Sequence, residues 1–193
     1  MLPILDHLTS FQKRAMPLSV KAWHQMIAQG LAPERAELIR GVIIEKMSKS
    51  ILHTKLAGRV LAVLQKFLGT QMWVRKEDPL TFTDSEPEPD VSAVAGSEAD
   101  YETHPTTARL VVEVSVSTLP EDRAMADIYA EAAVAEYWIV NAVDRCIELY
   151  QQPVAGHYQS IMRVDEAGVL ESAALPGLRL NVGELFAGLP RVV

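Results

Sequence analysis

A nearly continuous apolar segment at residues 110–116, interrupted by one carboxylate, is the feature that most constrains the fold. The segment has the sequence LVVEVSV. Such a run is typical of a central strand that is covered on both faces of a sheet. A helix at about 121–133 and a second buried strand at 137–140 follow it, so the three elements predict a right-handed crossover unit. An ionised Glu113 in the middle of this strand costs several kcal/mol unless another group pairs with it.

The rest of the chain supplies further elements of both kinds. Ser19 is suited to cap a first helix that carries Trp23, and Pro33 is suited to begin a short helical turn at 34–38. Residues 51–68 form the clearest helical pattern, which Gly69 ends. Strand patterns lie at 42–44, before this helix, and at 72–75, 80–83, 91–95, 145–150 and 157–163, after it. A last short helix is predicted at 182–186. We therefore predict a single α/β (or α+β) domain over residues 1–193, with a central mixed sheet flanked by helices.

Composition narrows the possible functions. The single cysteine, Cys146, excludes an internal disulfide and suits a reducing compartment. No apolar run approaches the roughly 20 residues of a membrane span, and residues 1–14 do not have the pattern of a secretory signal. We therefore predict a cytoplasmic protein with no membrane partner. The net charge of −7 argues against a broad phosphate-binding surface, although it permits a small site where metal ions offset acidic residues.

Two carboxylates are candidates for a metal site. Asp90 follows Pro89 at the start of the strand predicted at 91–95, and Glu113 lies on the same face of its strand as Val111 and Ser115. Together with a backbone carbonyl such as that of Val114, they would give oxygen ligands suited to Mg²⁺ or Mn²⁺. Such a metal activates water and stabilises a phosphoryl group under attack. A structural interpretation stays open, in which Glu113 pairs with an interior Arg or Lys and Asp90 caps a turn.

The remaining polar candidates are weaker. His53 lies in the first turn of the long helix, where a satisfied, half-buried structural histidine is a more common interpretation than a ligand. Glu37 has the pattern of a solvated helix residue. Cys146 is expected to pack as a small hydrophobe, and the pair Tyr137-Trp138 belongs to the predicted core. The sequence contains no phosphate-binding glycine loop, no zinc-ligand spacing and no serine nucleophile elbow.

The order of several short motifs resembles a known bacterial family. The motifs are ELIRG at 37–41, His53, EPDV at 88–91, VEVS at 112–115, Ser117-Thr118, Tyr129-Ala130 and EYWIV at 136–140. The chain resembles the family called domain of unknown function 820, or Uma2, over roughly residues 18–186. The resemblance implies a restriction-endonuclease-like PD-(D/E)XK nuclease fold with Mg²⁺ or Mn²⁺ as cofactor. It also implies that Asp90 and Glu113 hold the metal, that Glu37 positions metal-bound water, and that His53 touches the scissile phosphate or supports the site.

One departure from the family pattern concerns the active-site lysine. The nuclease motif places a lysine two residues after the glutamate, and this position is Ser115. The family often carries a lysine on the next helix instead, about one turn before the tyrosine, and this position is Met125. Arg123 is the only cation at 121–133; it remains protonated, so it is a candidate for stabilising charge and not for a base. Lys55 and Lys76 are two further candidate cations, but the sequence does not show whether either lies near the candidate carboxylates.

Three functions remain open at this stage. The leading hypothesis is a metal-dependent endonuclease that acts on nucleic acid, with DNA expected and a homodimer implied by the fold. The second is a catalytically degenerate member that binds nucleic acid or a protein, which the missing lysine and the acidic charge favour. The third is a structural homodimer whose carboxylates are paired internally. A lysine beside the metal site would favour catalysis, and a buried arginine paired with Glu113 would favour the structural alternative.

Overall fold

The core of the protein is a six-stranded mixed sheet. In the computed structural model, which describes residues 16–192, the strand order is β3-β4-β5-β6-β7-β8. Strands β5 and β6 are parallel, and every other neighbouring pair is antiparallel. The strands are β3 Met72–Arg75, β4 Val91–Ala95, β5 Leu110–Ser115, β6 Glu136–Asn141, β7 Cys146–Val154 and β8 His157–Asp165. The predicted mixed α/β class is confirmed, as is the parallel pairing across the helix between β5 and β6.

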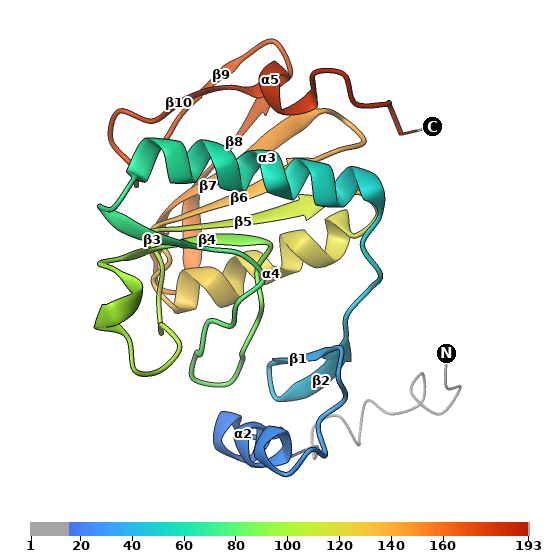
Figure 1. Ribbon diagram of the computed structural model, residues 1–193, viewed down its shortest axis with the longest axis vertical. Helices are drawn as coiled ribbons and strands as arrows, with labels where there is room; N and C mark the ends of the chain where they lie inside the picture. The colour runs from blue at the N-terminus through green and yellow to red at the C-terminus, as the bar shows by residue number, and fades with distance from the viewer. Residues whose placement is uncertain (1–15, 193) are drawn as a thin grey trace.

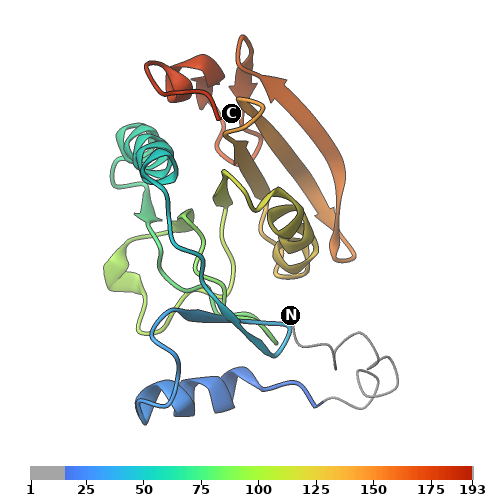
Figure 2. The same cartoon turned by 90° about the vertical axis from the view of Figure 1, so that its right-hand side faces the viewer.

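Two helices cover opposite faces of this sheet. Helix α3 (Ile51–Leu68) packs on the face that includes Val112, and helix α4 (Leu119–Glu131) packs on the face that includes Val111 (Figures 1 and 2). Ser50 caps α3 by accepting a hydrogen bond from the His53 backbone N–H, and Gly69 ends α3 with a φ of 53°. The predicted central strand is therefore buried on both sides, as its apolar run requires.

The first 30 described residues form a separate small layer. Helix α2 (Val20–Ala28) packs on a two-stranded sheet of β1 (Ala36–Ile39) and β2 (Val42–Glu45), below the main sheet in Figure 1. The turn between β1 and β2 is Arg40-Gly41, and both residues have positive φ angles, 51° and 73°. A side chain on Gly41 would clash with Pro17, since an added Cβ would lie 2.4 Å from the Pro17 Cβ.

Two predictions of local structure are wrong. Residues 36–39 form strand β1 and not a helical turn, because Ala36 and Leu38 alternate with the less buried Glu37 and Ile39. A window of five residues is too short to distinguish the alternation of a strand from the periodicity of a helix by pattern alone. Residues 80–83 are a loop and not a strand. The backbone N–H groups of Leu80, Thr81 and Phe82 donate to the carbonyls of Pro87, Pro105 and Ser85, which lie in loops and not in a neighbouring strand.

The C-terminal segment packs on the α3 side of the sheet. It consists of the hairpin β9 (Val169–Glu171) with β10 (Arg179–Asn181), followed by α5 (Val182–Phe186). The fully buried Glu136 of β6 connects it to the sheet by accepting hydrogen bonds from the backbone N–H groups of Ala173 and Ala174. The same carboxyl group accepts from Trp138 Nε1 and Gln151 Nε2, so four neutral donors surround one buried acidic side chain.

No helix between residues 16 and 192 has the length and apolar content that a membrane crossing requires. A short 3₁₀ turn at Glu98–Asp100 completes the regular structure.

Candidate active site

Asp90 and Glu113 lie side by side at the boundary between β4 and β5. The pairing of Val91 with Val112 brings the residue before β4 beside Glu113. Asp90 Oδ2 accepts a hydrogen bond of 2.8 Å from the Val114 backbone N–H. In return, the Asp90 backbone N–H donates to Glu113 Oε2 at 3.1 Å. These two bonds fix both carboxylates, and they place the Val114 peptide beside them.

Glu113 carries a carboxylate with no cationic partner among the described residues. Its Oε1 accepts a hydrogen bond of 2.7 Å from the Tyr129 hydroxyl of α4. Burial, followed by the negative charges of Asp90 and Asp122, raises the pKa of Glu113 well above its ordinary value. Asp122 is itself bonded to the Thr118 hydroxyl, and burial raises its pKa. This corner of the site therefore has an excess of negative charge.

Asp90 contacts one histidine and one lysine. His53 Nε2 lies 2.9 Å from Asp90 Oδ2, and Lys49 Nζ lies 2.8 Å from Asp90 Oδ1. Burial of Asp90 alone would raise its pKa, but the bonds from His53 and Lys49 outweigh it and lower the pKa. The second ring nitrogen of His53, Nδ1, is buried and has no hydrogen-bond partner within the described residues.

Glu37, on strand β1, contacts the segment that leads to Asp90. Its Oε2 accepts a hydrogen bond of 3.1 Å from the Glu88 backbone N–H. Burial raises the pKa of Glu37 despite that bond, and the charges of Glu88 and Asp90 add to the effect. The Glu88 N–H that binds Glu37 lies two residues before Asp90 in the chain, so Glu37 lies near the other two carboxylates. Its neighbour Glu88 is paired with Lys46.

Sequence reasoning missed the most informative cation of the site. Lys49 follows β2 and precedes Ser50, the cap of α3, so it reaches Asp90 from the same helix end as His53. The local sequence shows only that Lys49 lies one residue before the helix cap and so near the first turn of α3; it does not show the contact with Asp90, which is 41 residues away. Arg123 is not a partner of Asp90 or Glu113, since it donates two hydrogen bonds to Glu148 of β7. Lys76 contacts Glu77 and not the candidate carboxylates.

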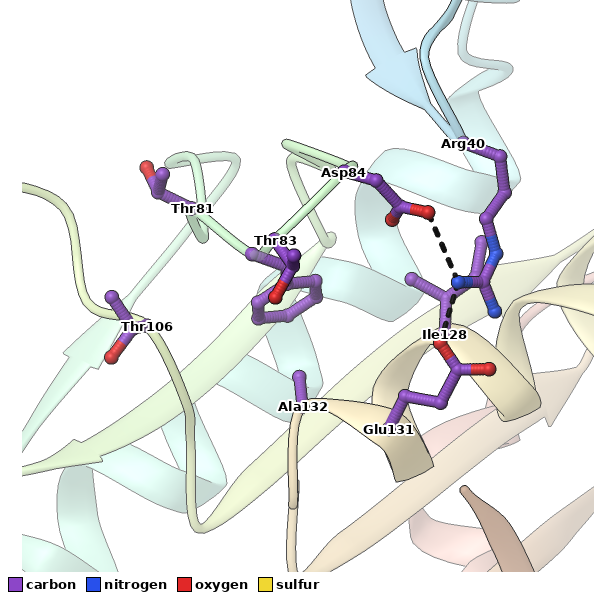
Figure 3. Close-up of a pocket in the computed structure, with 9 residues that line it drawn as sticks. Arg40, Thr81, Thr83, Asp84, Thr106, Ile128, Glu131 and Ala132 are labelled. Atoms are coloured by element: carbon purple, nitrogen blue, oxygen red, sulfur yellow. Dashed lines mark hydrogen bonds and ion pairs between the residues drawn. The ribbon is translucent and has the colours of Figure 1, made fainter. Parts of the chain in front are cut away.

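The described cavities lie elsewhere. A cavity of about 320 Å³ opens between α4 and the loop at 81–84 (Figure 3). In it, the Arg40 guanidinium donates to Asp84 at 3.2 Å and to Glu131 at 2.5 Å, so its charge is already balanced. None of Glu37, His53, Asp90 or Glu113 lines this cavity or the shallower one beside α2. In residues 16–192, no three His, Cys, Asp or Glu side chains are arranged as a ready metal cage.

Comparison with known proteins decides the family. A family model described as "Uma2: Putative restriction endonuclease" matches residues 23–183. The chain belongs to the Uma2 family. A crystal structure from Anabaena variabilis ATCC 29413, of "a putative nuclease belonging to DUF820", has the same fold as this Uma2 chain. The TM-score is 0.74 at 15% sequence identity, over 89% of this chain and 98% of the other. A search of curated proteins gives no match.

Proposed function

We propose that this Uma2 protein is a metal-dependent endonuclease that hydrolyses phosphodiester bonds in DNA. The observation that carries the proposal is the fixed pair of Asp90 and Glu113, in which Glu113 has no cationic partner within residues 16–192. A purely structural Glu113 would need either an interior Arg or Lys or a full set of neutral donors such as those around Glu136, because an unsatisfied buried carboxylate is destabilising. The described residues supply only the Tyr129 hydroxyl and the Asp90 N–H. Membership of a family named for restriction endonucleases supports the same conclusion.

The residues present suit Mg²⁺ or Mn²⁺. We assign Asp90, Glu113 and the backbone carbonyl of Val114 as ligands, since hard divalent cations prefer oxygen and Mg²⁺ commonly takes only one or two carboxylates from the protein. This small number of ligands is compatible with the lack of a three-residue cage in residues 16–192. A divalent cation held there would neutralise the excess negative charge and polarise a phosphoryl oxygen.

The chain's own side chains have distinct tasks in this proposal. Glu37 orients the attacking water and is placed to accept its proton, because burial gives this carboxylate a raised pKa. His53 holds Asp90 in position, a role that its 2.9 Å contact favours over direct contact with the phosphate. In the reaction, the water oxygen bonds to phosphorus, one P–O bond breaks, and the leaving oxygen takes up a proton.

A second candidate is a member of the family that binds nucleic acid or a protein without cleaving it. Ser115 and Met125 favour it, because both positions at which a lysine is expected lack a cation. The net charge of −7 favours it too.

Cleavage of supercoiled plasmid and of single-stranded DNA with Mg²⁺ or Mn²⁺ tests the proposal. We expect wild-type protein to cut and the Asp90→Ala variant to be inactive. No cutting by a wild type that binds Mn²⁺ at Asp90 would favour the binding protein. Equal Mn²⁺ binding by wild type and by the Asp90→Ala, Glu113→Ala double variant would rule out the metal site. We also propose action in the cytoplasm as a homodimer, and sedimentation of the purified protein tests the oligomeric state.

A further inference from the structure

Lys49 occupies a constrained position at the edge of the carboxylate pair. It is the last residue before the N-cap of α3, and the Ser50 hydroxyl accepts from the His53 backbone N–H at 3.1 Å. The helix end therefore presents two groups to one carboxylate, with Lys49 Nζ at Oδ1 and His53 Nε2 at Oδ2 of Asp90. The side chain of Lys49 keeps 28% of its surface exposed, whereas that of Asp90 keeps 6%. The ammonium thus lies where the site meets solvent.

The charge at this position has no substitute nearby. Among the described residues, no other Lys or Arg side chain contacts Asp90 or Glu113. An ammonium has three donors, and Lys49 directs them toward Asp90 and, at 3.3 Å, toward Glu77. Glu77 is partly exposed and makes a similar contact with Lys76, so it does not depend on Lys49 alone.

We propose that Lys49 is the catalytic cation of this site, contacting the phosphate under attack and stabilising the negative charge that builds up there. The inference rests on the proposed phosphodiesterase function. A compact positive charge fixed beside the reacting group stabilises a transition state because it needs no reorganisation during the reaction. Lys49 keeps its proton throughout, so the step transfers nothing to or from it. In this chain the cation comes from the loop before α3, and not from β5 or α4.

The test compares Lys49→Met with Lys49→Arg and with Lys76→Met as a matched control. Both methionine variants remove a cation from Glu77, but only the Lys49 variant removes one from Asp90. We expect Lys49→Met to cut plasmid about 100-fold more slowly and to bind Mn²⁺ at least as tightly as wild type, because it removes a competitor for Asp90. We expect Lys49→Arg to recover part of the activity and Lys76→Met to behave as wild type.

A binding measurement separates this inference from the proposed function. In Ca²⁺, which permits binding of a short DNA duplex without turnover, we expect Lys49→Met to bind about 10-fold more weakly than Lys76→Met. Cutting by Lys49→Met at the wild-type rate would overturn the role of Lys49 and leave the nuclease proposal intact. Loss of Mn²⁺ binding in that variant would also overturn it, since Lys49 would then only support Asp90. If the wild-type protein does not cut DNA, the nuclease proposal fails. In that case the duplex-binding assay still tests Lys49, because equal binding by Lys49→Met and Lys76→Met would overturn the inference about Lys49 as well.

Discussion

Two glutamates on neighbouring parallel strands have opposite surroundings. Glu136 opens β6 and is fully buried, with four neutral N–H donors directed at its two oxygens. Glu113, opposite Ile139 further along the same pair of strands, is only partly buried. It has one hydroxyl and one N–H, and two further carboxylates nearby. Glu136 is therefore fully hydrogen-bonded within the fold, whereas Glu113 lies in an environment that disfavours its negative charge.

This difference gives a criterion for distinguishing a structural carboxylate from a functional one, namely the set of hydrogen-bond donors around it. A structural carboxylate is satisfied by donors within the fold, because an unmet hydrogen bond in a low-dielectric interior is costly. A carboxylate that lacks such donors and faces like charges has an incomplete environment, which is typical of a ligand or catalytic site. The four predictions that follow test this contrast.

The largest effect is expected for loss of the charge at Glu113. The Glu113→Gln variant should lose cleavage by about 1,000-fold or more, equivalent to about 4 kcal/mol of transition-state stabilisation. Its free energy of unfolding should equal or exceed that of wild type near neutral pH, because the repulsion from Asp90 and Asp122 is removed. Plasmid cleavage and urea unfolding measure the two quantities. A destabilised Gln variant with normal cleavage would reverse the assignment of the two glutamates.

A smaller effect, on stability instead of activity, is expected at Glu136. Glu136→Ala leaves the buried donors of Trp138, Gln151, Ala173 and Ala174 without their acceptor. The free energy of unfolding should fall by about 3 kcal/mol, as for other buried hydrogen-bonded charges. Urea unfolding of this variant beside Glu113→Gln gives the direct comparison. An unfolding free energy within about 0.5 kcal/mol of wild type would show that the four bonds contribute little.

The surroundings of Glu113 should also make the stability of the protein depend on pH. Because the folded protein raises the pKa of Glu113, the stability that protonated Glu113 contributes is fully present below its ordinary pKa of 4.5. That contribution is lost as the pH rises through the raised folded value. Without added metal, Glu113→Gln should therefore gain stability relative to wild type as the pH increases above 4.5. Unfolding curves from pH 4 to 8 measure this difference, and a constant gap across that range would contradict it.

The smallest effect is expected for single neutral donors. Trp138→Phe removes one of the four donors to Glu136 and should lower the free energy of unfolding by about 1 kcal/mol without changing cleavage. Tyr129→Phe removes the hydroxyl at Glu113 and should change cleavage more than Trp138→Phe does. Paired urea unfolding and plasmid assays of these two variants make the measurement. Equal cleavage by both would show that the Tyr129 contact has no part in the reaction.

The sequence predicted the central elements of the fold because local signals agree there. Gly69 marks the end of α3, and the apolar run around Glu113 identifies β5. The same reasoning singled out Asp90 and Glu113, since a carboxylate stands out in an apolar strand. Lys49 and the strand that carries Glu37 could not be found in this way. Their positions depend on contacts over 41 and 51 residues of sequence, to Asp90 and Glu88 respectively, which no local pattern records.

The attachment of the β1–β2 hairpin has a consequence for how the site opens. The hairpin meets the rest of the protein through hydrogen bonds to the loop at 84–88, one of them from the Glu88 N–H to Glu37, and through the exposed ion pairs of Arg40. No strand of the six-stranded sheet pairs with it. Exposed ion pairs contribute about 0–1 kcal/mol each and weaken as salt is added. Segments that are not paired with the central sheet are among the first to undergo local unfolding. We therefore expect Glu37 to leave the site in smaller openings than those that displace Asp90 and Glu113, so that all three carboxylates lie together only while the hairpin is docked.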